Sequence, residues 1–278
     1  MTNDIVGLQD GSGCYAAFLT PKGKMLGDLR VLAAAEPEPQ LLLDTERATL
    51  QALFDMIRRF KIGYELELHK RTVQCGLLSL VGPRARAVAG AEELPGEEHA
   101  HRPASIGGCE VRLIATDLGV DVLCAAEDTD AVRAALLEAG AVAVSEEAAE
   151  ILRVERGRPR YGAELDDATI PQEAGLNERA VSFTKGCYVG QETVARLFYR
   201  GKPNRHLRGL RLSEPAPTGA ELRLGERVVG QLTSSVVSPA LGPIALALVR
   251  REAAVGDTLA VAGGASAEVV ELPFAQPA

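Results

Sequence analysis

Apolar residues recur at helical spacing in four stretches of the chain. The first stretch follows Asp44, a suitable N-cap, and its apolar positions i, i+3, i+4 and i+7 are Leu50, Leu53, Phe54 and Ile57. Comparable patterns predict a helix from Asp128 or Thr129 to Gly140, another that Ser145 caps, and a fourth over residues 191–199. Four helices are therefore expected.

Short apolar runs between turn residues predict strands in the first half of the chain, at residues 15–19, 28–32, 41–43, 64–69, 76–81, 111–115, 120–125 and 141–144. Residues 41–144 alternate strands and helices, which is typical of a ferredoxin-like α/β sandwich. The polar stretch at residues 92–103 predicts an exposed loop. Its His99 and His101 are expected to be solvated rather than metal-bound.

After residue 215 the pattern changes to short strands separated by Gly and Pro. They are expected at residues 222–224, 228–232, 236–237, 244–249, 258–261 and 269–270. This spacing favours a small all-β barrel at the C-terminal end. The chain as a whole is predicted to be of the α+β class.

The charge balance argues against broad binding to nucleic acid. The 278 residues carry a net charge of -8, and the sequence pI is about 5.2. A local concentration of cations without any acidic residue nevertheless lies between 196 and 211, at Arg196, Arg200, Lys202, Arg205, Arg208 and Arg211. Two interpretations stay open here, a solvated charged face and a site for a carboxylate anion.

Cysteine usage points to a reducing compartment. The five cysteines are odd in number and widely spaced, at positions 14, 75, 109, 124 and 187, with no Cys-x-x-Cys pair. This pattern favours neither a disulfide framework nor a stably bound metal or iron–sulfur cluster. The N-terminus lacks the pattern of a secretory signal, and the apolar runs are too short to cross a bilayer. We expect a cytoplasmic protein without a membrane partner.

Residues 185–192 read Lys-Gly-Cys-Tyr-Val-Gly-Gln-Glu and contain a candidate reactive thiol, Cys187. Lys185 and the N-terminus of the following helix are two features that lower the pKa of a thiol such as Cys187. Gly186 and Gly190 are expected to free the backbone on both sides of it. The alternative is a turn with a half-buried, inert cysteine.

This octapeptide closely resembles the signature of the YgfZ-type folate-binding proteins, relatives of a mitochondrial iron–sulfur cluster assembly factor. These proteins are similar in fold to the glycine-cleavage T-protein, an aminomethyltransferase. Three further segments resemble the family in the expected order, at residues 153–164, 170–176 and 229–239. The likeness covers most of the chain.

The resemblance implies a three-domain cloverleaf around a central hole that binds tetrahydrofolate. The domains would be a discontinuous folate-binding domain of residues 1–40 and 145–205, a ferredoxin-like domain of residues 41–144, and a β-barrel domain of residues 206–278. The resemblance also implies a first domain shortened at its N-terminus, through a mis-set start or a genuine loss. The protein is expected to be a monomer.

The resemblance further assigns the site residues. Glu155 would hold the pterin ring, whose adjacent N–H groups suit a carboxylate. Arg205, with Arg200 or Lys202, would meet the anionic glutamate tail of folate. Cys187 would react, assisted by Lys185, and the remaining signature residues would line the folate cavity, namely Tyr188, Gln191 and Glu192.

One position departs from the related transferases, which carry an Asp-Asp pair just after the first glycine turn. Here Gly27 precedes Asp28. The leading hypothesis is therefore a folate-binding accessory factor for iron–sulfur cluster assembly or repair, not a classical enzyme, whose partners are folate and iron–sulfur assembly or client proteins. The alternatives are a folate-dependent aminomethyltransferase that uses Asp28, and a plain folate-binding module.

Overall fold

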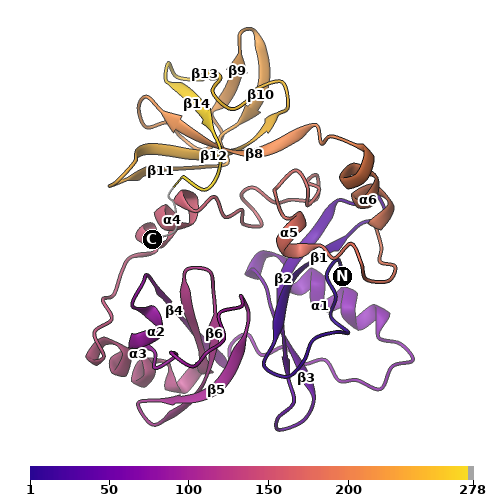
Figure 1. The fold of residues 1–278 in the computed structure, drawn as a ribbon, viewed down its shortest axis with the longest axis vertical. Coiled ribbons are helices and arrows are strands. Elements are labelled where there is room, and N and C mark those ends of the chain that lie inside the picture. The colour runs from indigo at the N-terminus through magenta and orange to yellow at the C-terminus, as the bar shows by residue number, and fades with distance from the viewer. Residues whose placement is uncertain (275–278) are drawn as a thin grey trace. The chain divides into compact units, whose positions relative to one another are not determined.

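The computed structural model describes residues 1–274, and these residues form two compact units. The first unit comprises residues 1–2, 17–28 and the chain from Val144 onward. The second comprises residues 3–16 and 29–143. Each unit is discontinuous in the sequence, and the first joins residues near the N-terminus to the chain from Val144 onward (Figure 1).

A three-stranded sheet near the N-terminus has the order β1-β2-β3, and the division between the units passes through its first two strands. The strands are β1 (Gly13–Leu19), β2 (Met25–Ala34) and β3 (Gln40–Asp44). Because β3 pairs with β2, it lies outside the four-stranded sheet of residues 75–125, with which the ferredoxin-like interpretation had grouped it.

Helix α1 (Arg47–Phe60) confirms the first amphipathic prediction, although its N-cap is Glu46 rather than Asp44. Asp44 is the last residue of β3 and pairs with Arg30 at 2.6 Å. Its carboxylate therefore forms an ion pair within the sheet and does not cap the helix.

The second unit contains a four-stranded antiparallel sheet of order β4-β7-β6-β5 (Figure 1). Its core includes Leu113, Val120, Val122 and Val132. Its elements are β4 (Cys75–Val81), α2 (Ala85–Val88), β5 (His101–Ile106), β6 (Cys109–Ala115), β7 (Gly119–Ala125), a 3-10 turn (Ala126–Asp128) and α3 (Thr129–Glu138).

Two strand predictions in this unit were wrong. Residues 64–69 and 141–144 form no strand, and Tyr64 and Val142 are exposed. Their apolar side chains meet no sheet partner, so the backbone gains no ladder of hydrogen bonds.

The predicted exposure of the two histidines was also wrong. His99 and His101 are 8% and 2% exposed. The reason is backbone pairing: the His99 N–H donates to the carbonyl of Ala115, and the His101 N–H donates to that of Gly11. The expected loop thus ends early, because β5 begins at His101.

The first unit contains a seven-stranded antiparallel sheet of order β10-β9-β13-β14-β8-β12-β11. It confirms the predicted C-terminal β domain. Leu210, Leu222, Leu259 and Val269 lie in its core. Its strands are β8 (Arg205–Leu212), β9 (Glu221–Leu224), β10 (Arg227–Gln231), β11 (Ser234–Ser238), β12 (Gly242–Arg250), β13 (Thr258–Val261) and β14 (Ser266–Val270).

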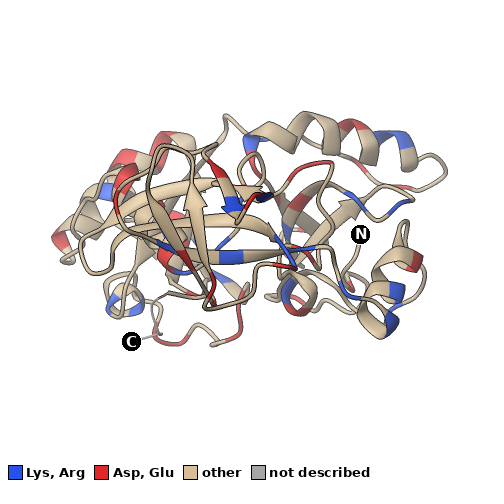
Figure 2. Cartoon of the chain, turned by 90° about the horizontal axis from the view of Figure 1, so that it is seen from above, with Lys and Arg blue, Asp and Glu red and all other residues tan. Residues whose placement is uncertain are grey.

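Strand β8 was not predicted, because its arginines interrupt the alternation of apolar and polar residues that indicates a strand. Leu207, Leu210 and Leu212 are buried, whereas Arg211 is exposed. Figure 2 shows Lys and Arg interspersed with Asp and Glu over much of the ribbon.

Three helices complete the first unit, α4 (Glu146–Glu155), α5 (Asn177–Ala180) and α6 (Gln191–Arg200). Ser145 caps α4 as predicted, by accepting a hydrogen bond from the Ala148 amide. Val154 of α4 packs against Ile244, Leu246 and Leu248 of β12. None of the helices in residues 1–274 has the length and apolarity that a membrane span requires.

Candidate functional site

The octapeptide forms the loop that leads into α6, and its second glycine shapes that loop. Gly190 is the N-cap of α6 with φ of 85°, and a Cβ there would lie 2.5 Å from the carbonyl oxygen of Thr20. Gly186 differs: its φ is not positive, and a Cβ would meet nothing within 4 Å. The expectation that both glycines require special backbone freedom was wrong for Gly186.

Gln191 closes this loop on itself. Its side-chain Oε1 accepts a hydrogen bond of 3.0 Å from the backbone N–H of Tyr188. Its backbone N–H donates to the Tyr188 carbonyl over 3.3 Å. These two contacts hold the residue after Cys187 against the first turn of α6. The backbone that follows Cys187 is thereby held at the start of α6.

Cys187 is exposed, and the cation beside it is already engaged. Lys185 Nζ donates to the Met1 carbonyl over 2.9 Å and lies 5.3 Å from the centroid of the Tyr188 ring. Helix α6 begins four residues after Cys187. The effect of Lys185 and of this helix on the thiol stays a prediction.

A hollow of about 230 Å³ in the first unit is lined by residues on both sides of Cys187 in the sequence, although Cys187 itself does not line it. It brings together four of the predicted site residues, Lys185, Tyr188, Gln191 and Glu192, with Ser182, Phe183, Ala195 and Tyr199. Burial raises the pKa of Tyr188. Whole-ligand pockets usually enclose about 300–1,000 Å³, so this hollow suits one ring or one side chain.

Glu155, the predicted pterin ligand, is the last residue of α4 and does not line this hollow. Its Oε1 accepts a hydrogen bond from the hydroxyl of Ser238. That hydroxyl oxygen in turn accepts from the amides of Ala240 and Leu241, at 3.1 and 3.0 Å. Ser238, which sequence reasoning matched to a family segment without giving it a role, therefore fixes the Glu155 carboxylate.

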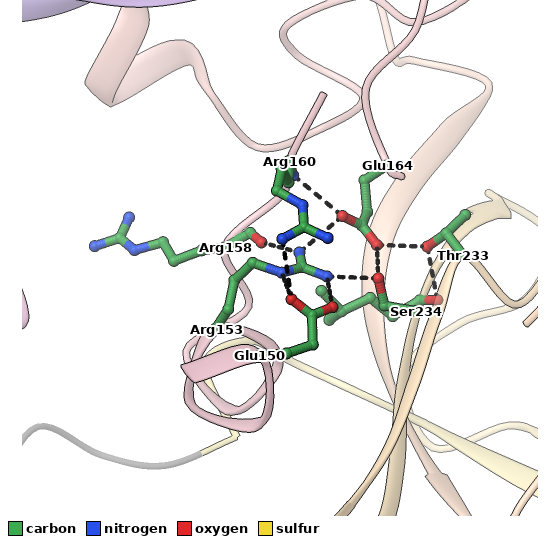
Figure 3. A network of polar contacts seen from close by, with 8 residues as sticks. Glu150, Arg153, Arg158, Arg160, Glu164, Thr233 and Ser234 are labelled. Atoms are coloured by element: carbon green, nitrogen blue, oxygen red, sulfur yellow. Dashed lines mark hydrogen bonds and ion pairs between the residues drawn. The ribbon is translucent and has the colours of Figure 1, made fainter. Parts of the chain in front are cut away.

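Two residues earlier on α4, Arg153 is the centre of a partly buried polar network (Figure 3). It donates to Glu150 at 2.7 Å and to Glu164 at 2.9 Å, and its hydrogen bond lowers the pKa of Glu150. Glu164 also accepts from Thr233 at 2.9 Å and Ser234 at 2.6 Å. The network attaches the helix that carries Glu155 to the β domain.

Arg205, the predicted partner of the folate tail, is engaged by another carboxylate. It donates to Glu173 at 2.9 Å and to the carbonyl of Ala168 at 3.1 Å. The hydrogen bond with Glu173 raises the pKa of Arg205. A ligand carboxylate at this position would have to share or displace Glu173.

Asp28 lies on β2, is 8% exposed and belongs to an acidic surrounding of Tyr161. Burial, followed by the charges of Asp167, Asp166 and Asp28, raises the pKa of Tyr161. Asp28 does not line the hollow beside Cys187. Across residues 1–274, no group of three His, Cys, Asp or Glu is placed to hold a metal ion.

Residues 1–185 match the model of the GCVT N-terminal domain, and residues 205–276 match that of the glycine cleavage T-protein C-terminal barrel domain. The chain belongs to the glycine cleavage T-protein family. The predicted fold is thereby confirmed as the mixed α/β fold of this family, with a curled C-terminal sheet.

Two members of the family show how far the likeness extends. A putative chloroplastic transferase of Arabidopsis thaliana is 29% identical over 287 residues, which cover 98% of this chain and 65% of the relative. The crystal structure of glycine cleavage system aminomethyltransferase T from Bartonella henselae superposes with a TM-score of 0.81 at 25% identity. That likeness covers 97% of this chain and 77% of the aminomethyltransferase. The fold is therefore transferase-like throughout.

Proposed function

We propose that this protein binds a reduced folate and acts, through Cys187, as an accessory factor in iron–sulfur cluster assembly or repair. One observation carries the proposal: Cys187 is exposed while its sequence neighbours Lys185 and Tyr188 line a hollow. A structural cysteine is usually buried, whereas a cysteine that meets a partner has to be accessible. The thiolate is also the ordinary protein ligand of iron–sulfur iron.

Folate binding is the second part of the proposal, and the family fold supports it. Glu155 is fixed by Ser238 at the end of a helix that the Arg153–Glu164 network attaches to the β domain. A carboxylate held in this way is pre-organised to accept the paired N–H groups of a pterin. Tetrahydrofolate, or a one-carbon derivative of it, is the proposed ligand.

Aminomethyl transfer is the second candidate function. In its favour, Asp28 is retained and buried close to Tyr161 within a transferase-like fold. Against it, Gly27 occupies the position where the resemblance leads us to expect a first aspartate. A general acid or base has to lie within hydrogen-bond reach of the reacting group, so the loss of one carboxylate weakens this candidate.

A rescue experiment tests the proposed role of the cysteine. In cells that lack this protein, the Cys187→Ala variant should fail to restore the activity of enzymes with four-iron clusters, although it accumulates to the normal level. Cys75→Ala is the matched control, because Cys75 is also exposed but lies in the second unit. Full rescue by Cys187→Ala would contradict the proposal.

Folate binding and transfer are measured separately. Calorimetric titration with tetrahydrofolate should show binding that Glu155→Gln weakens by about tenfold or more, as expected for the loss of a charged hydrogen-bond acceptor. Turnover of methylene-tetrahydrofolate with an amine donor, if abolished by Asp28→Asn, would instead favour the transferase. Absence of tetrahydrofolate binding would remove the folate part of the proposal.

A further inference from the structure

The exposed face of α6 combines aromatic rings and cations beside Cys187. Phe198 and Tyr199 are 47% and 66% exposed, and the Phe198 ring stacks on Phe183 with a centroid distance of 3.9 Å. Tyr199 contacts Phe198 edge-on at 5.0 Å. Rings that are exposed yet fixed by one another lose little conformational entropy when a partner covers them, and aromatic residues are enriched in interface centres.

Helix geometry places the cations next to the hollow. Residues four apart lie on one row of a helix, so Gln191, Ala195 and Tyr199 form the row that lines the hollow. The adjoining row consists of Glu192, Arg196 and Arg200, and Lys202 follows shortly after the helix ends. Arg196, Arg200 and Lys202 are all exposed. Lys185 and Tyr188 of the Cys187 loop therefore line the hollow, and the row with Arg196 and Arg200 adjoins the α6 residues that line it.

These three cations differ from two others of the basic run, Arg205 and Arg208. Arg205 and Arg208 are held by Glu173 and Glu271 in ion pairs of 2.9 and 3.1 Å. Glu192 is the single acidic residue of α6. In a chain of net charge -8, Arg196, Arg200 and Lys202 thus form a local positive surface on the helix that follows the exposed Cys187.

We propose that this surface, formed by Arg196, Tyr199, Arg200 and Lys202, docks an acidic polypeptide segment of a partner protein and guides a cysteine of that segment to Cys187. The inference rests on the proposed function and names the chemistry of its partner. Charge complementarity selects the acidic segment, because opposite potentials steer encounters and fix register. The hollow accommodates one partner side chain beside the cysteine.

Nucleic acid fits this surface less well. Phosphate-backbone binding draws on many clustered cations, and here three cations adjoin a hollow that suits a single side chain. An oligonucleotide also lacks a thiol to present to Cys187. A polypeptide satisfies the cations, the rings and the hollow together.

Thiol–disulfide exchange gives a test that needs neither folate nor an iron–sulfur cluster. A short synthetic peptide with one central cysteine is prepared as its mixed disulfide with thionitrobenzoate. The Cys187 thiol first loses its proton to solvent, and the thiolate attacks the peptide sulfur. The bond between that sulfur and thionitrobenzoate breaks, and the coloured thionitrobenzoate thiolate leaves. Rates are compared for peptides whose flanking residues are glutamate, glutamine or lysine, and the rate of Cys187→Ala is subtracted to remove the reaction of Cys75.

The full chain should react about tenfold faster with the glutamate peptide than with the glutamine peptide at low salt, and slowest with the lysine peptide. This preference should fall towards equality in salt and in the combined variant Arg196→Gln/Arg200→Gln/Lys202→Gln. Arg71→Gln/Arg84→Gln/Arg133→Gln is the control, since it removes three exposed cations from the second unit and should keep the preference.

Equal rates with the glutamate and glutamine peptides would overturn the inference, as would an undiminished preference in the combined variant. Stronger competition by a single-stranded oligonucleotide than by a cysteine-free glutamate peptide of equal charge would assign the surface to nucleic acid and also overturn it. Failure of the proposed function appears elsewhere, as full cellular rescue by Cys187→Ala. The two failures are therefore distinguishable.

Discussion

The carboxylate of Glu164 lies 2.9 Å from the guanidinium of Arg153, and the Glu164 side chain has no solvent exposure. Thr233 and Ser234 supply hydrogen bonds to the other carboxylate oxygen. The buried carboxylate thus accepts hydrogen bonds from Arg153 of α4, from the backbone N–H of Arg160 in the following loop, and from the β domain. This relationship holds the helix that ends in Glu155.

Replacing one partner of this pair should be costly. Glu164→Gln leaves the Arg153 guanidinium with only the partly exposed Glu150 carboxylate to balance its charge, so we expect the free energy of unfolding to fall by about 2–3 kcal/mol. Urea denaturation followed by circular dichroism measures it. Arg223→Gln is the control, because the Arg223–Glu221 pair is exposed and should contribute at most about 1 kcal/mol. Equal effects of the two substitutions would contradict the structural role of Glu164.

The two glycines of the octapeptide should respond differently to alanine. Gly190→Ala places a Cβ against the Thr20 carbonyl in a backbone with positive φ, so it should destabilise the protein by more than about 1 kcal/mol. Gly186→Ala enters open space and should change stability by less than about 0.5 kcal/mol. Thermal unfolding of both variants checks this; similar midpoints would show that the Gly190 conformation is not required.

Ser238 should act on ligand binding through Glu155. Ser238→Ala removes the donor to Glu155 Oε1, and the carboxylate then loses its fixed orientation. We expect tetrahydrofolate affinity to fall severalfold, less than in Glu155→Gln, with a stability loss of about 1 kcal/mol. Ser238→Thr, which keeps the hydroxyl, should restore affinity. Titration of the three variants decides between this positioning role and a purely structural one, in which affinity would be unchanged.

Burial, assisted by the nearby Arg112 cation, lowers the pKa of His101 below its usual 6.5. As pH falls through 6.5, His101 becomes protonated in the unfolded chain but stays neutral in the folded chain. Stability is therefore complete above this pH and declines below it, until the folded pKa is reached. Unfolding free energies measured over this range should show a shallower decline in His101→Gln. An unchanged decline in His101→Gln would contradict this prediction.

Local patterns were sufficient for much of the fold. Helix α1 and helix α6 were predicted because an amphipathic period is visible within one segment, and the cap at Ser145 follows from a single side chain. Strand β8 was missed because a run rich in arginine is also typical of a charged linker. The burial of its leucines becomes visible only in the sheet.

The sequence alone determined the octapeptide, the family likeness and the helix that follows Cys187, since each depends on neighbouring residues. The three-dimensional packing was needed to show that Gly190 has a positive φ, that His99 and His101 are buried, and that Arg205 pairs with Glu173. These properties come from segments distant in the sequence. Burial and charge pairing depend on three-dimensional packing, which no local period encodes.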